Sequence, residues 1–136
     1  MITEATDFWL CKDEQSFKMK YIKNFLNRNY ESQRIFCIET EETVKGFPDV
    51  MEVISDGVGN HVYLYEFKYS DKSGKIKFQP TQPAFYKANP NIKVEIVAFN
   101  KKTGNIHKFN ADELFSNNSF YHMNMKAEVN LCKAER

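Results

Sequence analysis

The chain has 136 residues, of which 42% are hydrophobic and 27% are charged, a composition typical of one folded domain and not of a disordered chain. Its 19 basic and 18 acidic side chains leave a net charge of only +1, so overall charge predicts no polyanionic partner, and any affinity for nucleic acid must come from a local patch. No apolar stretch is long enough to cross a bilayer and the first residues do not resemble a signal peptide, so we expect a cytoplasmic protein without a membrane partner.

A first helix is predicted from about residue 13 to about residue 29. Its apolar side chains recur at the three- and four-residue spacing of a single helix face: Phe17, Tyr21, Ile22, Phe25 and Leu26. Asp13 is a candidate cap for this helix. Glu14 lies three residues before Phe17, and we therefore expect it on the same inward face.

Three short strands are predicted next, at residues 34–40, 49–55 and 61–69. The sequence Asp-Gly-Val-Gly-Asn at residues 56–60 is typical of a tight hairpin, so the second and third of these strands should be paired neighbours. A polar loop is expected at residues 70–77.

A second helix is predicted at residues 80–88, with Thr81 as a candidate cap and Pro83 in its first turn. Strands follow at residues 92–99 and 106–109. The order helix, three strands, helix, strand predicts an α/β fold with a mixed central sheet flanked by helices, because a helical crossover can return the chain parallel to an earlier strand.

We expect a single domain over residues 1–136. Its core should span about residues 10–110, followed by a helical C-terminal extension at residues 111–136, where Asn110 and Glu113 resemble a capping box.

The strand at residues 61–69 contains the most informative pattern. Alternate side chains share one face of a strand, and here one face is aromatic while the other begins apolar and ends with Glu66 and Lys68. Apolar residues on both faces indicate a central strand, so this carboxylate and amine would lie at the end of a buried sheet, where charges need partners or a metal ion. A solvent-facing Glu–Lys pair is the alternative that this strand alone leaves open.

Asp49 opens the preceding strand directly after Pro48. Hairpin pairing would bring Asp49 and Glu66 to the same end of the sheet, and two carboxylates at short range repel unless a proton or cation lies between them. Oxygen ligands suit a hard ion such as Mg²⁺ or Mn²⁺. A nearby lysine such as Lys68 can stabilise charge that develops on a phosphoryl group.

Pro48-Asp49 followed by Glu66-Phe67-Lys68 resembles the motif of the PD-(D/E)XK nuclease superfamily, and the predicted order of elements resembles its core. Gly46-Phe47-Pro48-Asp49 is similar to the Gly-x-Pro-Asp of the VRR-NUC branch. Pro80-Thr81-Gln82 is similar to the Ser-Pro-x-Gln that opens the second helix of that branch, with Gln79 in place of the serine.

This resemblance covers roughly residues 10–100 and implies a restriction-endonuclease-like core with a role for each matched position. Asp49 and Glu66 would bind the metal ion together with the backbone carbonyl of Phe67. Lys68 would position or activate the attacking water.

Two helical residues would complete such a site. Gln82 would face it from the second helix. Glu14 best matches the glutamate that often completes the site from the first helix in related resolvases, with Glu39, Glu41 and Glu42 as the alternatives.

The resemblance implies Mg²⁺- or Mn²⁺-dependent hydrolysis of DNA phosphodiester bonds. Standalone members include resolvase-like enzymes of phages or mobile elements, such as Holliday junction resolvases, so we expect an endonuclease selective for junction or flap DNA. The alternatives are a sequence-specific restriction-type endonuclease and a catalytically silent nuclease fold that binds DNA or protein. Lys72, Lys75 and Lys77 follow the proposed active strand and are candidate contacts to the DNA backbone, or only solvated loop residues.

A homodimer is expected, because symmetric cutting of a junction needs two sites related by a two-fold axis. Several aromatic residues outside the main periodic faces are candidates for the interface: Trp9, Tyr30, Phe115, Phe120 and Tyr121. The alternative is that the C-terminal segment covers these side chains within one subunit.

Overall fold

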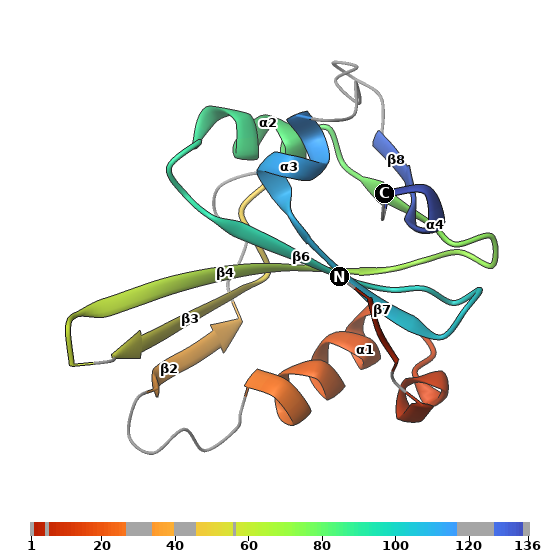
Figure 1. Ribbon diagram of the computed structural model, residues 1–136, viewed down its shortest axis with the longest axis horizontal. Coiled ribbons are helices and arrows are strands. Elements are labelled where there is room, and N and C mark those ends of the chain that lie inside the picture. The colour runs from red at the N-terminus through yellow and green to blue at the C-terminus, as the bar shows by residue number, and fades with distance from the viewer. Residues whose placement is uncertain are drawn as a thin grey trace.

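The computed structural model describes residues 2–4, 6–26, 34–39, 46–55, 57–116 and 127–134, and a six-stranded sheet forms its centre (Figure 1). In spatial order its strands are β1 (Ile2–Glu4), β7 (Asn105–Asn110), β6 (Val94–Phe99), β4 (Asn60–Tyr69), β3 (Val50–Ser55) and β2 (Arg34–Glu39). A second, two-stranded sheet pairs β5 (Lys75–Phe78) with β8 (Ala127–Asn130).

The large sheet is mixed, as the sequence predicts. β3 and β4 form the expected antiparallel hairpin, in which Ser55 pairs with Asn60. β4 and β6 run parallel, while the other neighbouring pairs of this sheet are antiparallel. The helix between β4 and β6 in the chain thus provides the crossover that a parallel pair requires.

Helices cover both faces of this sheet (Figure 1). On one face lie a 3₁₀-helical turn, η1 (Thr6–Leu10), then α1 (Glu14–Tyr21) and its π-helical continuation, η2 (Ile22–Leu26). On the other face lie α2 (Thr81–Ala88) and α3 (Ala111–Ser116), and a short α4 (Leu131–Ala134) follows β8. None of the helices in the described ranges is long and apolar enough to cross a membrane.

Each face of the sheet has its own hydrophobic core, because the central strands carry apolar side chains on both sides. Under α1, the ring of Phe17 packs at centroid distances of 6.1 Å from Phe67 and 5.6 Å from Phe99. Under α2 and α3, Phe115 packs on Phe78 at 4.9 Å and on Tyr86 at 5.7 Å. Burying one such side chain contributes about 1.5–3 kcal/mol, so both cores hold the central strand β4 in place.

The predicted start of the first helix is confirmed. Asp13 is its N-cap, with extended backbone angles, and its Oδ1 accepts a hydrogen bond from the Ser16 backbone N–H at 2.8 Å. Ser16 Oγ in turn accepts from the Asp13 backbone N–H at 3.2 Å, which completes a capping box. The end predicted near residue 29 lies outside the described residues.

Three predictions about secondary structure were wrong. Part of the segment expected to be a polar loop is strand β5, whose alternating side chains bury Ile76 and Phe78. Its partner β8 lies in the C-terminal segment expected to be helical, so that segment contains a strand as well as helices. Thr81 is the first helical residue of α2 and not its cap, since Pro80 occupies the N-cap position without a side-chain hydrogen bond.

The aromatic residues proposed for a dimer interface differ in how far they are exposed. Phe115 is buried in the core, which contradicts its assignment to an exposed patch, whereas Trp9 is exposed as predicted. Tyr30, Phe120 and Tyr121 lie outside the described residues.

Candidate active site

Asp49 and Glu66 meet across the β3–β4 hairpin. Val50 pairs with Tyr65 in the antiparallel register, so the next residues toward the start of β3, Asp49 and Glu66, are cross-strand neighbours. Asp49 Oδ2 accepts a hydrogen bond from the backbone N–H of Phe67 at 3.1 Å. This bond fixes the Asp49 carboxylate beside β4, as the hairpin pattern predicts.

The segment before Asp49 is packed against α2. Gly46 has a φ of +85°, and a Cβ atom at this position would collide with the backbone carbonyl of Thr81. Only glycine permits both this conformation and this close approach. Phe47 packs edge-on against Phe85 with ring centroids 5.4 Å apart, so the chain leading to Asp49 and the helix above it are held together.

The Glu66 carboxylate is buried and incompletely satisfied. Only 2% of Glu66 is exposed, and its Oε1 has no hydrogen-bond partner among the described residues. Burial raises the pKa of Glu66, and the neighbouring Asp49 carboxylate raises it further, while Lys68 opposes both effects. A buried acid in this position favours a bound proton or a cation.

Lys68 lies on the same face of β4 as Glu66, and its amine is held from two sides. Nζ donates a hydrogen bond to Gln82 Oε1 at 3.0 Å and lies 4.6 Å from the ring centroid of Phe78. Gln82 Oε1 also accepts from the backbone N–H of Gln79 at 2.9 Å, which fixes the amide. Gln82 therefore faces the site, as predicted, through its contact with Lys68.

Tyr86 lies near enough to the carboxylates to feel their charge, although the sequence analysis did not select it. It is 3% exposed, and its hydroxyl has no hydrogen-bond partner among the described residues. Burial raises the pKa of Tyr86, and the nearby Glu66 and Asp49 carboxylates add to the rise. Its position one helical turn after Gln82 was the available signal, because residues four apart lie on the same helix face.

Glu14 is exposed and is not part of the buried face of α1, in contrast to the prediction. Glu14 nevertheless interacts electrostatically with the site. Desolvation raises the pKa of Glu14, while Lys68 lowers it and Asp49 raises it. The described residues contain no group of three or more His, Cys, Asp or Glu side chains that could hold a metal ion. Glu14 thus lies near the Asp49–Glu66 pair, and its role as a third metal ligand stays a prediction. The alternatives at positions 39, 41 and 42 cannot be compared with it, because their side chains lie outside the described part.

The pair of carboxylates fits a divalent cation. Mg²⁺ is commonly held by one or two carboxylates, with water and substrate oxygens completing its coordination. Asp49 and Glu66 supply two carboxylates, and the orphan Oε1 of Glu66 is a buried acceptor available to a cation. The backbone carbonyl of Phe67 stays a predicted third ligand.

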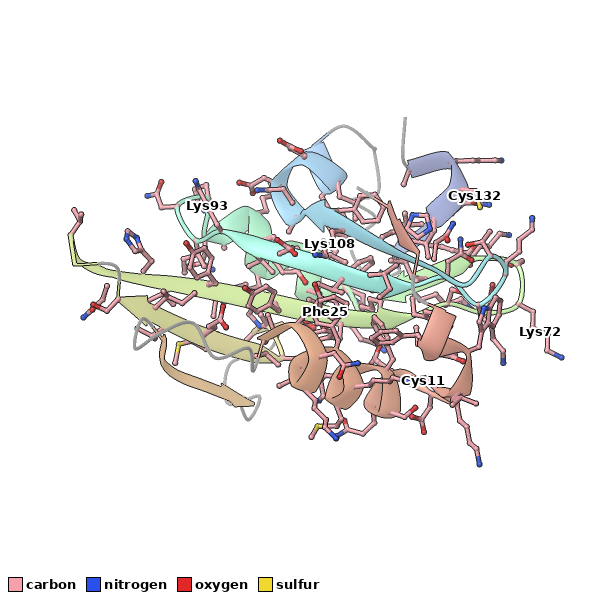
Figure 2. All side chains as sticks on the ribbon, turned by 60° about the horizontal axis from the view of Figure 1, so that its bottom comes forward. Cys11, Phe25, Lys72, Lys93, Lys108 and Cys132 are labelled. Atoms are coloured by element: carbon pink, nitrogen blue, oxygen red, sulfur yellow. The ribbon has the colours of Figure 1, made fainter. Side chains whose placement is uncertain are left out.

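The lysines that follow the site differ in their surroundings. Lys75 Nζ lies 3.5 Å from Glu128 Oε1, and Lys77 is paired with the same Glu128 in the β5–β8 register. Lys72 is exposed in the turn before β5, and its side chain extends away from the body of the protein (Figure 2). A contact with DNA stays a prediction for each of them.

Comparison of the chain with models of protein families, with curated proteins and with solved structures gives no match. The chemistry of the site therefore has to follow from its own residues: two adjacent carboxylates, a lysine held by a glutamine, and a buried phenol.

Proposed function

We propose that the protein is a metal-dependent phosphodiesterase that cleaves DNA, with Asp49, Glu66 and Lys68 at its active site. The observation that supports this most strongly is the buried Glu66 Oε1, which has no hydrogen-bond partner among the described residues and lies beside a second carboxylate. Buried polar atoms in folded proteins are nearly always hydrogen-bonded. An acid left unsatisfied next to another acid is better explained by a ligand than by stability.

The residues of the site have separate tasks in this reaction. Asp49 and Glu66 would hold the cation, and the chemistry it would supply there is to offset charge on the phosphodiester and to lower the pKa of a water molecule. Lys68, oriented by Gln82, places a positive charge where the phosphate oxygens gain negative charge during attack. Glu14, with its raised pKa and exposed position, suits a group that exchanges a proton with the attacking water.

The proposal includes membership of the PD-(D/E)XK superfamily and a restriction-endonuclease-like core. The order α1, β2, β3, β4, α2, β6 and the parallel β4–β6 pair support it. Strand β5 is an addition between β4 and α2. Selectivity for junction or flap DNA and a homodimer that brings two sites together also belong to this proposal.

Cleavage of a panel of DNA structures tests the function. The purified chain is incubated with Mn²⁺ or Mg²⁺ and a labelled four-way junction, flap, or linear duplex of matched sequence, with EDTA as the control. We expect metal-dependent cuts at the branch point. Cutting of the linear duplex at one sequence would favour a restriction-type enzyme, and binding without any cleavage would favour a catalytically silent fold.

Removing the glutamine that holds the lysine should slow the reaction without unfolding the protein. Gln82→Ala breaks the 3.0 Å bond to Lys68 Nζ. Because the lysine keeps its charge but loses its orientation, we expect a rate loss of about tenfold, less than for removal of the lysine itself. Single-turnover cleavage kinetics measure this loss. Wild-type rates in Gln82→Ala would mean that the bond only closes the helix against the sheet.

Removing the Tyr86 hydroxyl should lower activity without lowering stability. Tyr86→Phe deletes a buried hydroxyl that has no partner among the described residues, so we expect unchanged or higher thermal stability. Tyr86 is influenced by the charges of Glu66 and Asp49. Its hydroxyl can donate to water or to an oxygen in the loaded site, so cleavage should slow by about tenfold. Thermal melts and Mn²⁺-dependent kinetics on one preparation measure both effects. A stable variant with full activity would rule out this contribution.

A further inference from the structure

A surface hollow of about 590 Å³ lies beside the end of β4. Four lysines and two aromatic residues contribute to its lining: Lys12, Lys72, Lys101, Lys102, Trp9 and Tyr69. The lysines come from three separate parts of the chain, namely the residues before α1, the β4–β5 turn and the β6–β7 turn. Because the net charge of the chain is only +1, this is a local concentration of positive charge and not a general property of the surface.

The Tyr69 side of the hollow is held in place by several contacts. The Tyr69 hydroxyl donates a hydrogen bond to the Cys11 carbonyl oxygen at 2.8 Å, and its ring stacks on Phe99 with centroids 5.3 Å apart. The backbone N–H of Lys101 donates to Ser70 Oγ at 2.7 Å, and Lys101 Nζ lies 5.8 Å from the Tyr69 ring centroid. The turn that carries two of the lysines is thus attached to the end of β4.

Trp9 is fixed but exposed. Its indole packs edge-on against Phe99 with centroids 5.9 Å apart. It also occupies the space where a Cβ atom of Gly104 would lie, and Gly104 has a φ of +79°. Even so, 54% of Trp9 is exposed. A large aromatic side chain that is held by the fold and still faces water beside lysines is suited to stacking on a ligand.

Neighbouring acidic side chains are engaged elsewhere. The hollow itself is lined by no aspartate or glutamate among the described residues. Asp13 accepts the capping hydrogen bond from Ser16, and Asp71 Oδ1 accepts from the backbone N–H groups of Ser73 and Lys75 at 2.9 and 3.0 Å. Both carboxylates are therefore directed to their own turns.

We infer that this hollow binds a single-stranded segment of nucleic acid, with phosphates on the lysines and a base stacked on Trp9. The choice of nucleic acid as partner rests on the proposed function. Sites for single strands combine a positive groove with exposed aromatic rings, since unpaired bases can stack on a side chain. A duplex offers phosphates to lysines but keeps its bases stacked inside.

The hollow and the active site share two chain segments. Lys68 and Tyr69 are consecutive residues of β4, whose side chains point to opposite faces of the sheet. Lys12 and Glu14 are two residues apart at the start of α1. A strand bound in the hollow would therefore lie at the end of β4 that also carries Lys68 of the proposed active site, which suits a flap or an open junction arm.

Trp9 gives a local signal for binding, because it is the one tryptophan in the sequence. The full chain in EDTA, where cleavage cannot proceed, is titrated with oligo(dT) while the emission of Trp9 is followed. The same titration uses Lys101→Ala/Lys102→Ala and, as a control with the same charge change, Lys23→Ala/Lys93→Ala. Lys23 and Lys93 are exposed and do not line the hollow, and Lys93 lies far from Lys72 (Figure 2).

We expect oligo(dT) to quench the emission of Trp9. The Lys101/Lys102 variant should bind oligo(dT) about tenfold more weakly. The slope of log affinity against log salt concentration should fall in magnitude by about 1.4, which is about 0.7 for each lost phosphate contact. The control variant should match the wild type. Lys72→Ala, in a different turn, should give about half that change in slope.

Three results would overturn the inference: no quenching by oligo(dT), equal loss in both double variants, or equal quenching by a duplex or by inorganic polyphosphate. Quenching without cleavage of any DNA in Mn²⁺ would refute the proposed function and leave the hollow as a single-strand site. Cleavage without quenching would refute the hollow alone.

Discussion

Glu66→Gln and Asp49→Asn should each slow metal-dependent DNA cleavage by on the order of a thousandfold, because each replaces an anionic ligand in a site whose cation offsets several kcal/mol of transition-state charge. The amide keeps the size of the side chain, so the loss reports charge and not packing. Single-turnover kinetics in Mn²⁺ measure the effect. Glu113→Gln, at an exposed position of α3, makes the same charge change away from the site and should leave the rate unchanged.

Stability should change in the opposite direction. Burial and Asp49 raise the pKa of Glu66 in the folded protein above the ordinary value of 4.5. Protonation of Glu66 therefore favours folding at low pH, and this contribution to stability is lost as pH rises from 4.5 through the raised pKa. Glu66→Gln cannot ionise, so in EDTA its melting temperature should be higher than that of the wild type at neutral pH. The rise should be about 3–6 °C for each kcal/mol gained in the free energy of unfolding. The difference should shrink toward pH 4. Lower stability of Glu66→Gln at neutral pH, or unchanged cleavage, would contradict the assignment of this carboxylate to a ligand site.

Lys68→Met should lose about a hundredfold to a thousandfold in cleavage rate while Mn²⁺ binding is kept or strengthened, since the variant removes a cation that acts on the transition state and no metal ligand. Methionine preserves the apolar stem that lies against Phe78, which limits the structural effect. Lys68 also lowers the pKa of Glu66, so the acid limb of the pH–rate profile should move to higher pH in the variant. Calorimetric Mn²⁺ titration and a pH–rate series separate the two effects.

The exposed Lys93 provides the matched control, because Lys93→Met removes a lysine from the segment before β6, at a position that is not a candidate DNA contact. It should cleave as fast as the wild type. Near-normal turnover of Lys68→Met would mean that Lys68 is only an ion-pair partner for Glu66.

The placement of Asp49, Glu66 and Lys68 could be predicted from the sequence because it depends on short-range geometry. A tight turn sets the register of β3 on β4, and alternation along β4 places Glu66 and Lys68 on one face. The position of Gln82 at the site was predicted only through the resemblance of a helix-opening motif, and its hydrogen bond to Lys68 was not predicted.

The residues that sequence analysis misplaced depend on long-range packing. Strand β5 pairs with β8, which lies about fifty residues later, as in Lys75 opposite Asn130, and no local pattern specifies that partner. Tyr86 depends for its place near the carboxylates on α2, which packs closely on the chain at Gly46. Glu14 is the first residue of α1, and side chains in a helix tilt toward its N-terminus. Because no helical turn precedes Glu14, its side chain has no turn of α1 to lie against.

Calorimetric titration of Mn²⁺ into the wild type and into Glu66→Gln tests most directly whether the Asp49–Glu66 carboxylate pair is a cation site. We expect the wild type to bind Mn²⁺ and Glu66→Gln to bind it at least about a hundredfold more weakly, since a direct ligand should matter at least as much as the residues that only orient ligands. Equal affinity in the two proteins, or no binding by the wild type, would contradict the account.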